Sequence, residues 1–154
     1  MSTIDADGVT IAGLAGLAGV HLGYTDWQEM KQERVNLFAD ATDDHQFIHV
    51  DPERAKATPF GGTVAHGFLS LSLLAPIGTS LLHVSDAKMG VNYGLNRVRF
   101  PAPLRVGAEW RGGAEIVEVE EIDGGVQLKL LVTVEVKGSV KPAVVAEQLV
   151  RVYG

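Results

Sequence analysis

The chain has 154 residues, contains no cysteine and carries a formal net charge of −6. This length fits a single domain with its own core, and the lack of cysteine excludes disulfides, thiolate metal sites and a catalytic thiol. The acidic balance argues against nucleic acid as a partner, while 46% apolar and 21% charged residues are ordinary for a globular protein.

The first 20 residues predict a short helical extension of one domain that spans residues 1–154, with a helix around residues 11–19. The first basic residue is Lys31, so the segment lacks the positive charge of a secretory signal or a transit peptide. The apolar run at residues 9–20 is too short to cross a bilayer. We therefore expect a cytoplasmic protein with no membrane partner.

The next elements alternate between strand and helix. A strand is predicted at residues 22–30, and an amphipathic helix at residues 32–42. Residues 42–51 are mostly polar and contain no glycine, which predicts a loop with a defined conformation. At its end, Asp51 and Pro52 are typical of the N-cap and first position of a helix.

Residues 63–77 contain no Lys, Arg, Asp or Glu and are apolar on nearly all sides, which predicts a buried helix. Period-two patterns then predict long antiparallel strands, with the turn Asp123-Gly124-Gly125 joining two of them. These strands lie at residues 91–100, 114–121, 126–136 and 144–153. The order predicts an α+β fold in which an antiparallel sheet wraps around one buried helix.

Titratable side chains concentrate between residues 40 and 51, and a second polar cluster, Ala65-His66-Gly67, stands at the start of the buried helix. The ordered set Phe38-Ala39, Asp44, Ile48-His49 and Asp51-Pro52, followed by this cluster, resembles the motif of the MaoC-like (R)-specific enoyl-CoA hydratases. The segment from Arg99 to Pro103 with Gly107 resembles a later part of that family's pattern. The resemblance covers roughly residues 20–152, and is greatest to the short, single-hotdog 3-hydroxyacyl-thioester dehydratases.

The resemblance implies a single hotdog fold and a reversible hydration of enoyl thioesters. It implies no metal, nucleotide or redox cofactor, since CoA or the pantetheine of an acyl carrier is part of the substrate. It also implies a homodimer whose sheets join edge to edge.

The residue types suit this chemistry. Water must lose a proton as it attacks Cβ, Cα must gain one, and the thioester oxygen must be stabilised. His49 is a natural base near neutral pH, and Asp44, five residues away, can hold the same water. The backbone N–H of Gly67 at the helix start is the expected oxyanion donor. We expect His49 to deprotonate water and Asp44 to protonate Cα, although the sequence also allows the reverse.

Four further residues are candidates for substrate binding. Phe47 and Phe68 would shape an acyl tunnel, and Arg99 would meet CoA phosphates unless its strand face is simply solvated. His66 either holds local structure at the helix start or touches the substrate.

Three alternatives remain open at this level. Asp44, His45, His49 and Asp51 would suit a divalent metal if they lay on one helix. The protein could also be a hotdog thioesterase, or a non-catalytic acyl-binding subunit.

Overall fold

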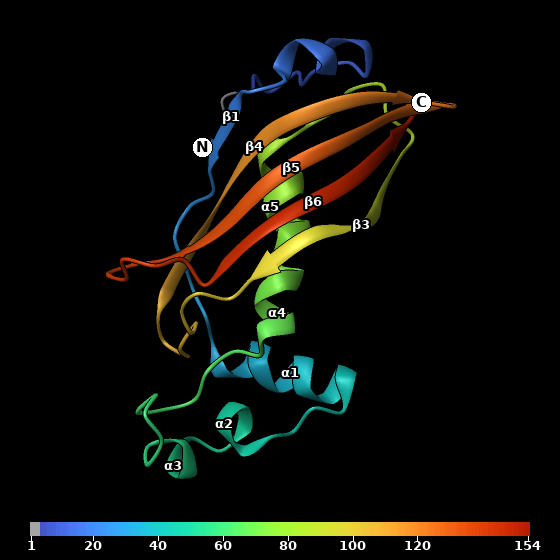
Figure 1. Ribbon diagram of the computed structural model, residues 1–154. Coiled ribbons are helices and arrows are strands. Elements are labelled where there is room, and N and C mark those ends of the chain that lie inside the picture. Colours follow the sequence, from blue (N-terminus) through green and yellow to red (C-terminus); the bar gives the residue numbers. More distant parts are fainter. Residues whose placement is uncertain (1–3) are drawn as a thin grey trace.

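The computed structural model describes residues 4–154, so residues 1–3 of the predicted extension lie outside the described part. One antiparallel sheet curves around a long broken helix, as predicted, and three short helices lie beyond one end of the sheet (Figure 1). The strand order is β1-β4-β5-β6-β3, and β2 also pairs with β4.

The four long predicted strands are confirmed, and each is as long as or longer than expected. They are β3 (Met89–Arg99), β4 (Glu109–Ile122), β5 (Gly125–Val136) and β6 (Val144–Tyr153). The predicted hairpin joins β4 to β5, with Ile122 paired with Gly125 and Gly124 at a φ of 82°. A left-handed φ at this turn is readily adopted by glycine.

The single strand predicted at residues 22–30 is wrong in detail, because the segment forms two short strands, β1 (His21–Tyr24) and β2 (Gln28–Glu29). Both pair with β4. Between them the Thr25 hydroxyl accepts a hydrogen bond from the N–H of Gly112. This side-chain bond interrupts the regular ladder and divides the strand.

The buried helix begins four residues later than predicted. Its first part, α4 (Gly67–Ser72), is followed by α5 (Leu74–Leu81), with Leu73 between them. Residues 63–65 are extended instead, because the Ala65 N–H donates to the Leu104 carbonyl and the Thr63 carbonyl accepts from Val106. The break lies close to Pro76, which has no N–H to offer the Ser72 carbonyl one turn earlier.

This helix buries one face rather than all of its surface. Four residues spaced one turn apart point into the core and are at most 4% exposed: Leu69, Leu73, Ile77 and Leu81. The opposite face, from Phe68 to Thr79, lines a cavity. Both faces are apolar, which explains why the sequence resembles a fully buried helix.

The remaining elements carry the polar segment. A 3₁₀ helix, η1 (Ala12–Leu17), replaces the first predicted helix, and α1 (Gln32–Thr42) is confirmed. The segment predicted as a loop contains a helical turn, α2 (Phe47–Val50), and is followed by α3 (Pro52–Ala55). Asp51 caps α3 as predicted, since its Oδ1 accepts a hydrogen bond from the Arg54 N–H at 3.1 Å. Within residues 4–154, no helix is long and apolar enough to span a membrane.

The helix and the sheet approach each other most closely at Gly112 in β4. A Cβ atom at this position would overlap the side chain of Ile77, which is fully buried. The packing of α5 on the sheet therefore requires glycine here.

We predict that Gly112→Ala lowers the free energy of unfolding by about 1–3 kcal/mol, because the added methyl group overpacks the core. Gly78→Ala is the control, since Gly78 lies on α5 with open space around it and should tolerate a methyl group. Urea denaturation measures both. Equal stability of Gly112→Ala and the wild type would contradict this account of the packing.

Candidate active site

His49 lies on α2 with its ring buried. Its Nδ1 is 2.7 Å from the backbone carbonyl oxygen of Val64. Because a carbonyl can only accept, Nδ1 carries the proton, and Nε2 of the neutral ring holds a free lone pair. The Val64 N–H in turn donates to the Ile48 carbonyl, so two hydrogen bonds join α2 to the segment before α4.

His66 is the N-cap residue of α4 and is 2% exposed. Its Nε2 donates to the backbone carbonyl of Asp44 at 3.0 Å, so it ties the Asp44 segment to the helix start. Its ring stacks on that of His49, with centroids 3.9 Å apart. Its Nδ1 is buried and has no hydrogen-bond partner in the described part of the chain.

The Asp44 side chain is exposed and faces these two rings. One ligating atom each of Asp44, His49 and His66 lies within 4.8 Å of the others. Two hydrogen bonds of about 2.8 Å through one water molecule span a similar distance. The predicted pair is therefore brought together at a separation that one water can bridge.

The environment favours the neutral form of His49. Burial lowers the pKa of its ring below the ordinary 6.5, and the neighbouring His66 acts in the same direction. The hydrogen bond to Val64 and the charge of Asp44 oppose the shift but do not cancel it. At neutral pH, His49 is thus able to accept a proton.

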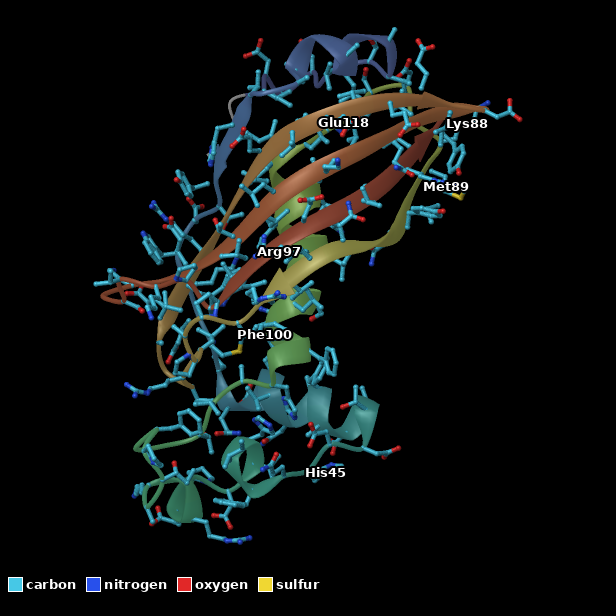
Figure 2. All side chains as sticks on the ribbon, viewed as in Figure 1. His45, Lys88, Met89, Arg97, Phe100 and Glu118 are labelled. Atoms are coloured by element: carbon cyan, nitrogen blue, oxygen red, sulfur yellow. The ribbon has the colours of Figure 1, made fainter. Side chains whose placement is uncertain are left out.

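The start of α4 faces the same region. The first intrahelical bond runs from the Ser70 N–H to the His66 carbonyl, so the N–H groups of Gly67, Phe68 and Leu69 have no acceptor within the helix. A Cβ on Gly67 would meet the Phe100 ring at 3.4 Å (Figure 2). This is an ordinary van der Waals distance, so the Phe100 ring lies beside the helix start at Gly67.

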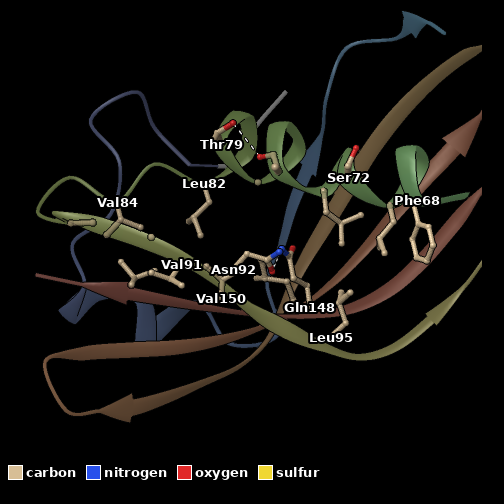
Figure 3. A pocket seen from close by; sticks show the side chains of 18 residues that line it. Phe68, Ser72, Thr79, Leu82, Val84, Val91, Asn92, Leu95, Gln148 and Val150 are labelled. Carbon is tan, nitrogen blue, oxygen red and sulfur yellow. Dashed lines mark hydrogen bonds between the residues drawn. The ribbon is translucent and has the colours of Figure 1, made fainter. Parts of the chain in front are cut away.

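An apolar cavity of about 560 Å³ begins at Phe68 and runs along α4 and α5, opposite β3 and β6 (Figure 3). Phe68 lines this cavity and is 74% exposed. The size is within the usual range for pockets that hold small ligands.

Two of the predicted binding residues lie elsewhere. Phe47 does not line the cavity, and packs instead under the guanidinium of Arg54 at 4.3 Å. Arg99 is exposed at the end of β3, where its Nη1 donates to the Val98 carbonyl at 2.7 Å.

The geometry does not favour the metal site considered above. Residues 43–46 are not helical, and the His45 ring bonds to Asp40 at 2.8 Å on the outer side of the loop (Figure 2). His66, rather than His45, lies beside His49 as a potential metal ligand. The planes of the stacked His49 and His66 rings, however, differ by only 24°. Their lone pairs cannot both converge on one ion at the short bond lengths that zinc requires.

Sequence reasoning missed Gln32 at the start of α1. Its Nε2 donates to the His49 carbonyl at 2.7 Å, and its Oε1 accepts from the buried Thr63 hydroxyl at 2.6 Å. The amide thus holds α2 and the segment before α4 at a fixed separation. A polar residue on a helix gives no sequence signal for this role, because its partners are 17 and 31 positions away.

Comparison with known proteins gives consistent matches. Residues 15–138 match the model of the family described as the MaoC like domain. The chain is 54% identical to 3-hydroxyacyl-thioester dehydratase Z of Mycobacterium tuberculosis, over 92% of this chain and 95% of the relative.

The fold is similar to that of solved hydratases. It superposes on the unliganded R-hydratase PhaJ1 from Pseudomonas aeruginosa with a TM-score of 0.77 and 20% identity, over 95% of this chain and 86% of the other. The (R)-hydratase from A. caviae involved in PHA biosynthesis superposes with a TM-score of 0.72 and 25% identity. The match covers 86% of this chain and 94% of the other. The expected hotdog fold is confirmed.

We predict that the pKa of His49, measured by NMR titration of its ring, lies below 6.5 because the ring is buried. Asp44→Asn should lower it further, since the variant removes the negative charge that favours the protonated ring. A pKa of 6.5 or above in the wild-type protein, or an increase in Asp44→Asn, would contradict the described environment.

Proposed function

The chain belongs to the family of MaoC-like domains, and on this basis we propose that it reversibly adds water to trans-2-enoyl-CoA thioesters to form (R)-3-hydroxyacyl thioesters. That it is an enzyme of the hydratase–dehydratase type follows from the family and from the 54% identity with a dehydratase. The (R) stereochemistry, the enoyl-CoA substrate and the roles of individual residues are parts of the proposal.

The observation that carries the mechanism is the free lone pair on Nε2 of a His49 ring that lies close to the Asp44 carboxylate. The Val64 carbonyl holds the ring in the tautomer that can take a proton from water. Ligating atoms of the pair lie within 4.8 Å, which suits one shared water. This arrangement favours His49 as the base toward water over the reverse assignment.

Hydration then proceeds with balanced proton transfers. The water oxygen bonds to Cβ while one water proton passes to His49 Nε2, and the double-bond electrons move toward Cα. The Asp44 carboxylate then takes this proton from His49 and delivers it to Cα, which restores the neutral ring and the ionised carboxylate. Both groups belong to one segment, so water and proton reach the same face of the double bond.

The thioester oxygen needs donors while it carries negative charge. We assign this role to the backbone N–H of Gly67, which has no acceptor within the helix. His66 acts as a positioning residue, because it holds the Asp44 carbonyl and stacks on His49. These groups supply every proton transfer and charge contact of the reaction, so the proposal requires no cofactor beyond the CoA or pantetheine of the substrate.

The acyl chain is assigned to the cavity that begins at Phe68. The cavity follows directly from the helix start where the thioester would bind, and its walls are mainly apolar. Burial of the chain there supplies binding energy in proportion to its apolar area.

The proposal includes a homodimer. Strand β3 pairs with β6 on one side only, and its exposed residues include Met89, Tyr93 and Leu95. An unpaired edge with apolar side chains favours association with a second strand.

We predict that Asp44→Asn and His49→Gln each lower kcat/KM for crotonyl-CoA by ~10²–10⁴, because each removes a proton-transfer group. The loss of enoyl absorbance measures the rate. Asp43→Asn is the matched control: the neighbouring carboxylate ends α1 at a φ of 60°, which asparagine tolerates, and should leave the rate unchanged.

Other outcomes of this assay would contradict the proposal. Near-normal turnover in both variants would exclude the Asp44–His49 mechanism. Release of free CoA from saturated acyl-CoA without hydration would indicate a thioesterase. Tight binding of acyl-CoA with no turnover, for short and long enoyl chains alike, would indicate a non-catalytic subunit.

We predict that sedimentation equilibrium gives twice the chain mass of 16.4 kDa, because the β3 edge pairs with a second copy. An active species at the mass of one chain would contradict the dimer but not the chemistry.

A further inference from the structure

The inward face of β6 contains one residue that breaks its apolar pattern. Val144, Ala146 and Val152 on this face are at most 5% exposed, and Val150 lines the cavity beside them. Gln148 occupies the middle of the series and is only 6% exposed. An amide side chain at such a position is costly unless its polar atoms are hydrogen-bonded.

Gln148 has one protein partner. Its Nε2 is 3.2 Å from Oδ1 of Asn92 on the neighbouring strand β3, and both side chains point into the middle of the cavity (Figure 3). Phe68 and Leu95 lie on one side of this Asn92–Gln148 pair, and Val84 and Val91 lie on the other.

The pair keeps hydrogen-bonding capacity that no neighbour uses. One amide carbonyl oxygen and the remaining amide N–H groups have no partner within residues 4–154, and this holds for either orientation of the two amides. Two hydroxyls also line the cavity, but each donates to its own helix: Ser72 to the Leu69 carbonyl at 2.6 Å, and Thr79 to the Pro76 carbonyl at 3.1 Å. The free capacity in the wall is therefore concentrated at one place.

We propose that the Asn92–Gln148 pair binds a hydroxyl group in the middle of the acyl chain, so that hydroxylated enoyl thioesters are the preferred substrates. A hydroxyl both donates and accepts, which matches the free carbonyl and the free N–H groups of the pair. A plain alkyl chain would remove water from these groups and leave them without partners, which lowers its relative affinity. This inference rests on the proposed function, because it assigns the cavity to the acyl chain.

The test compares a medium-chain trans-2-enoyl-CoA with its isomers hydroxylated at successive mid-chain carbons. We expect at least one isomer to exceed the plain chain about 10-fold or more in kcat/KM, in line with sites that hydrogen-bond a substrate hydroxyl. Gln148→Met has a similar shape and no amide, and should abolish this preference while improving turnover of the plain chain.

Two controls separate a loss of substrate preference from a general loss of folding or catalysis. Thr79→Val changes another polar residue of the same wall and should keep the preference. Crotonyl-CoA has no mid-chain carbon, so its turnover by each variant reports whether the Asp44–His49 pair still works. Asn92→Leu, at a more exposed position, is the second variant if Gln148→Met does not fold.

The outcomes distinguish this inference from the proposed function. Turnover with no preference for any hydroxylated isomer overturns the inference, as does a preference that survives both Gln148→Met and Asn92→Leu. Absence of all turnover, including that of crotonyl-CoA, overturns the proposed function instead. In that case calorimetric Kd values for saturated acyl-CoA with and without the hydroxyl still test the pair, and equal values overturn the inference.

Discussion

The hydrogen bond from His49 Nδ1 to the Val64 carbonyl is the contact on which the site depends. It selects the tautomer of the ring and leaves the Nε2 lone pair free to accept a proton. It also requires residues 63–65 to be extended, so that one side faces α2 and the other faces residues 104–106. The helix can start only after this segment, which places its free N–H groups beside the same pair.

The central helix has two tasks that conflict. Its core face must be apolar to pack under the sheet, while its start must present polar groups to a substrate. The chain separates the two along the helix axis: His66 and Gly67 stand at the first turn, and the face lining the cavity is apolar farther on. Burial of the His49 ring has a chemical consequence as well, because the lowered pKa keeps the ring neutral and ready to accept a proton.

Much of this arrangement could be predicted from the sequence. The period-two strands and the apolar helix determine the fold class, and the resemblance to the MaoC-like motif pointed to Asp44, His49 and Gly67 as site residues. The helix start was misplaced because residues 63–66 continue the run without Lys, Arg, Asp or Glu. Only their bonds to distant residues make residues 63–65 extended. Phe47 and Arg99 stay predictions as substrate-binding residues, because an aromatic ring or a guanidinium has the same sequence signal whether it contacts a substrate or a neighbouring side chain. Gln148 interrupts an alternating apolar face and was visible in the sequence, but its meaning depends on the cavity and on Asn92.

The most direct test of the central claim is the stereochemistry of the product that the wild-type protein forms from crotonyl-CoA. A water held by Asp44 and His49 on one face of the double bond predicts rapid loss of the enoyl absorbance and a single (R)-3-hydroxybutyryl-CoA product on chiral analysis. A racemic product would show that water is not delivered to one face by this pair, and an (S) product would contradict the proposed orientation of the substrate.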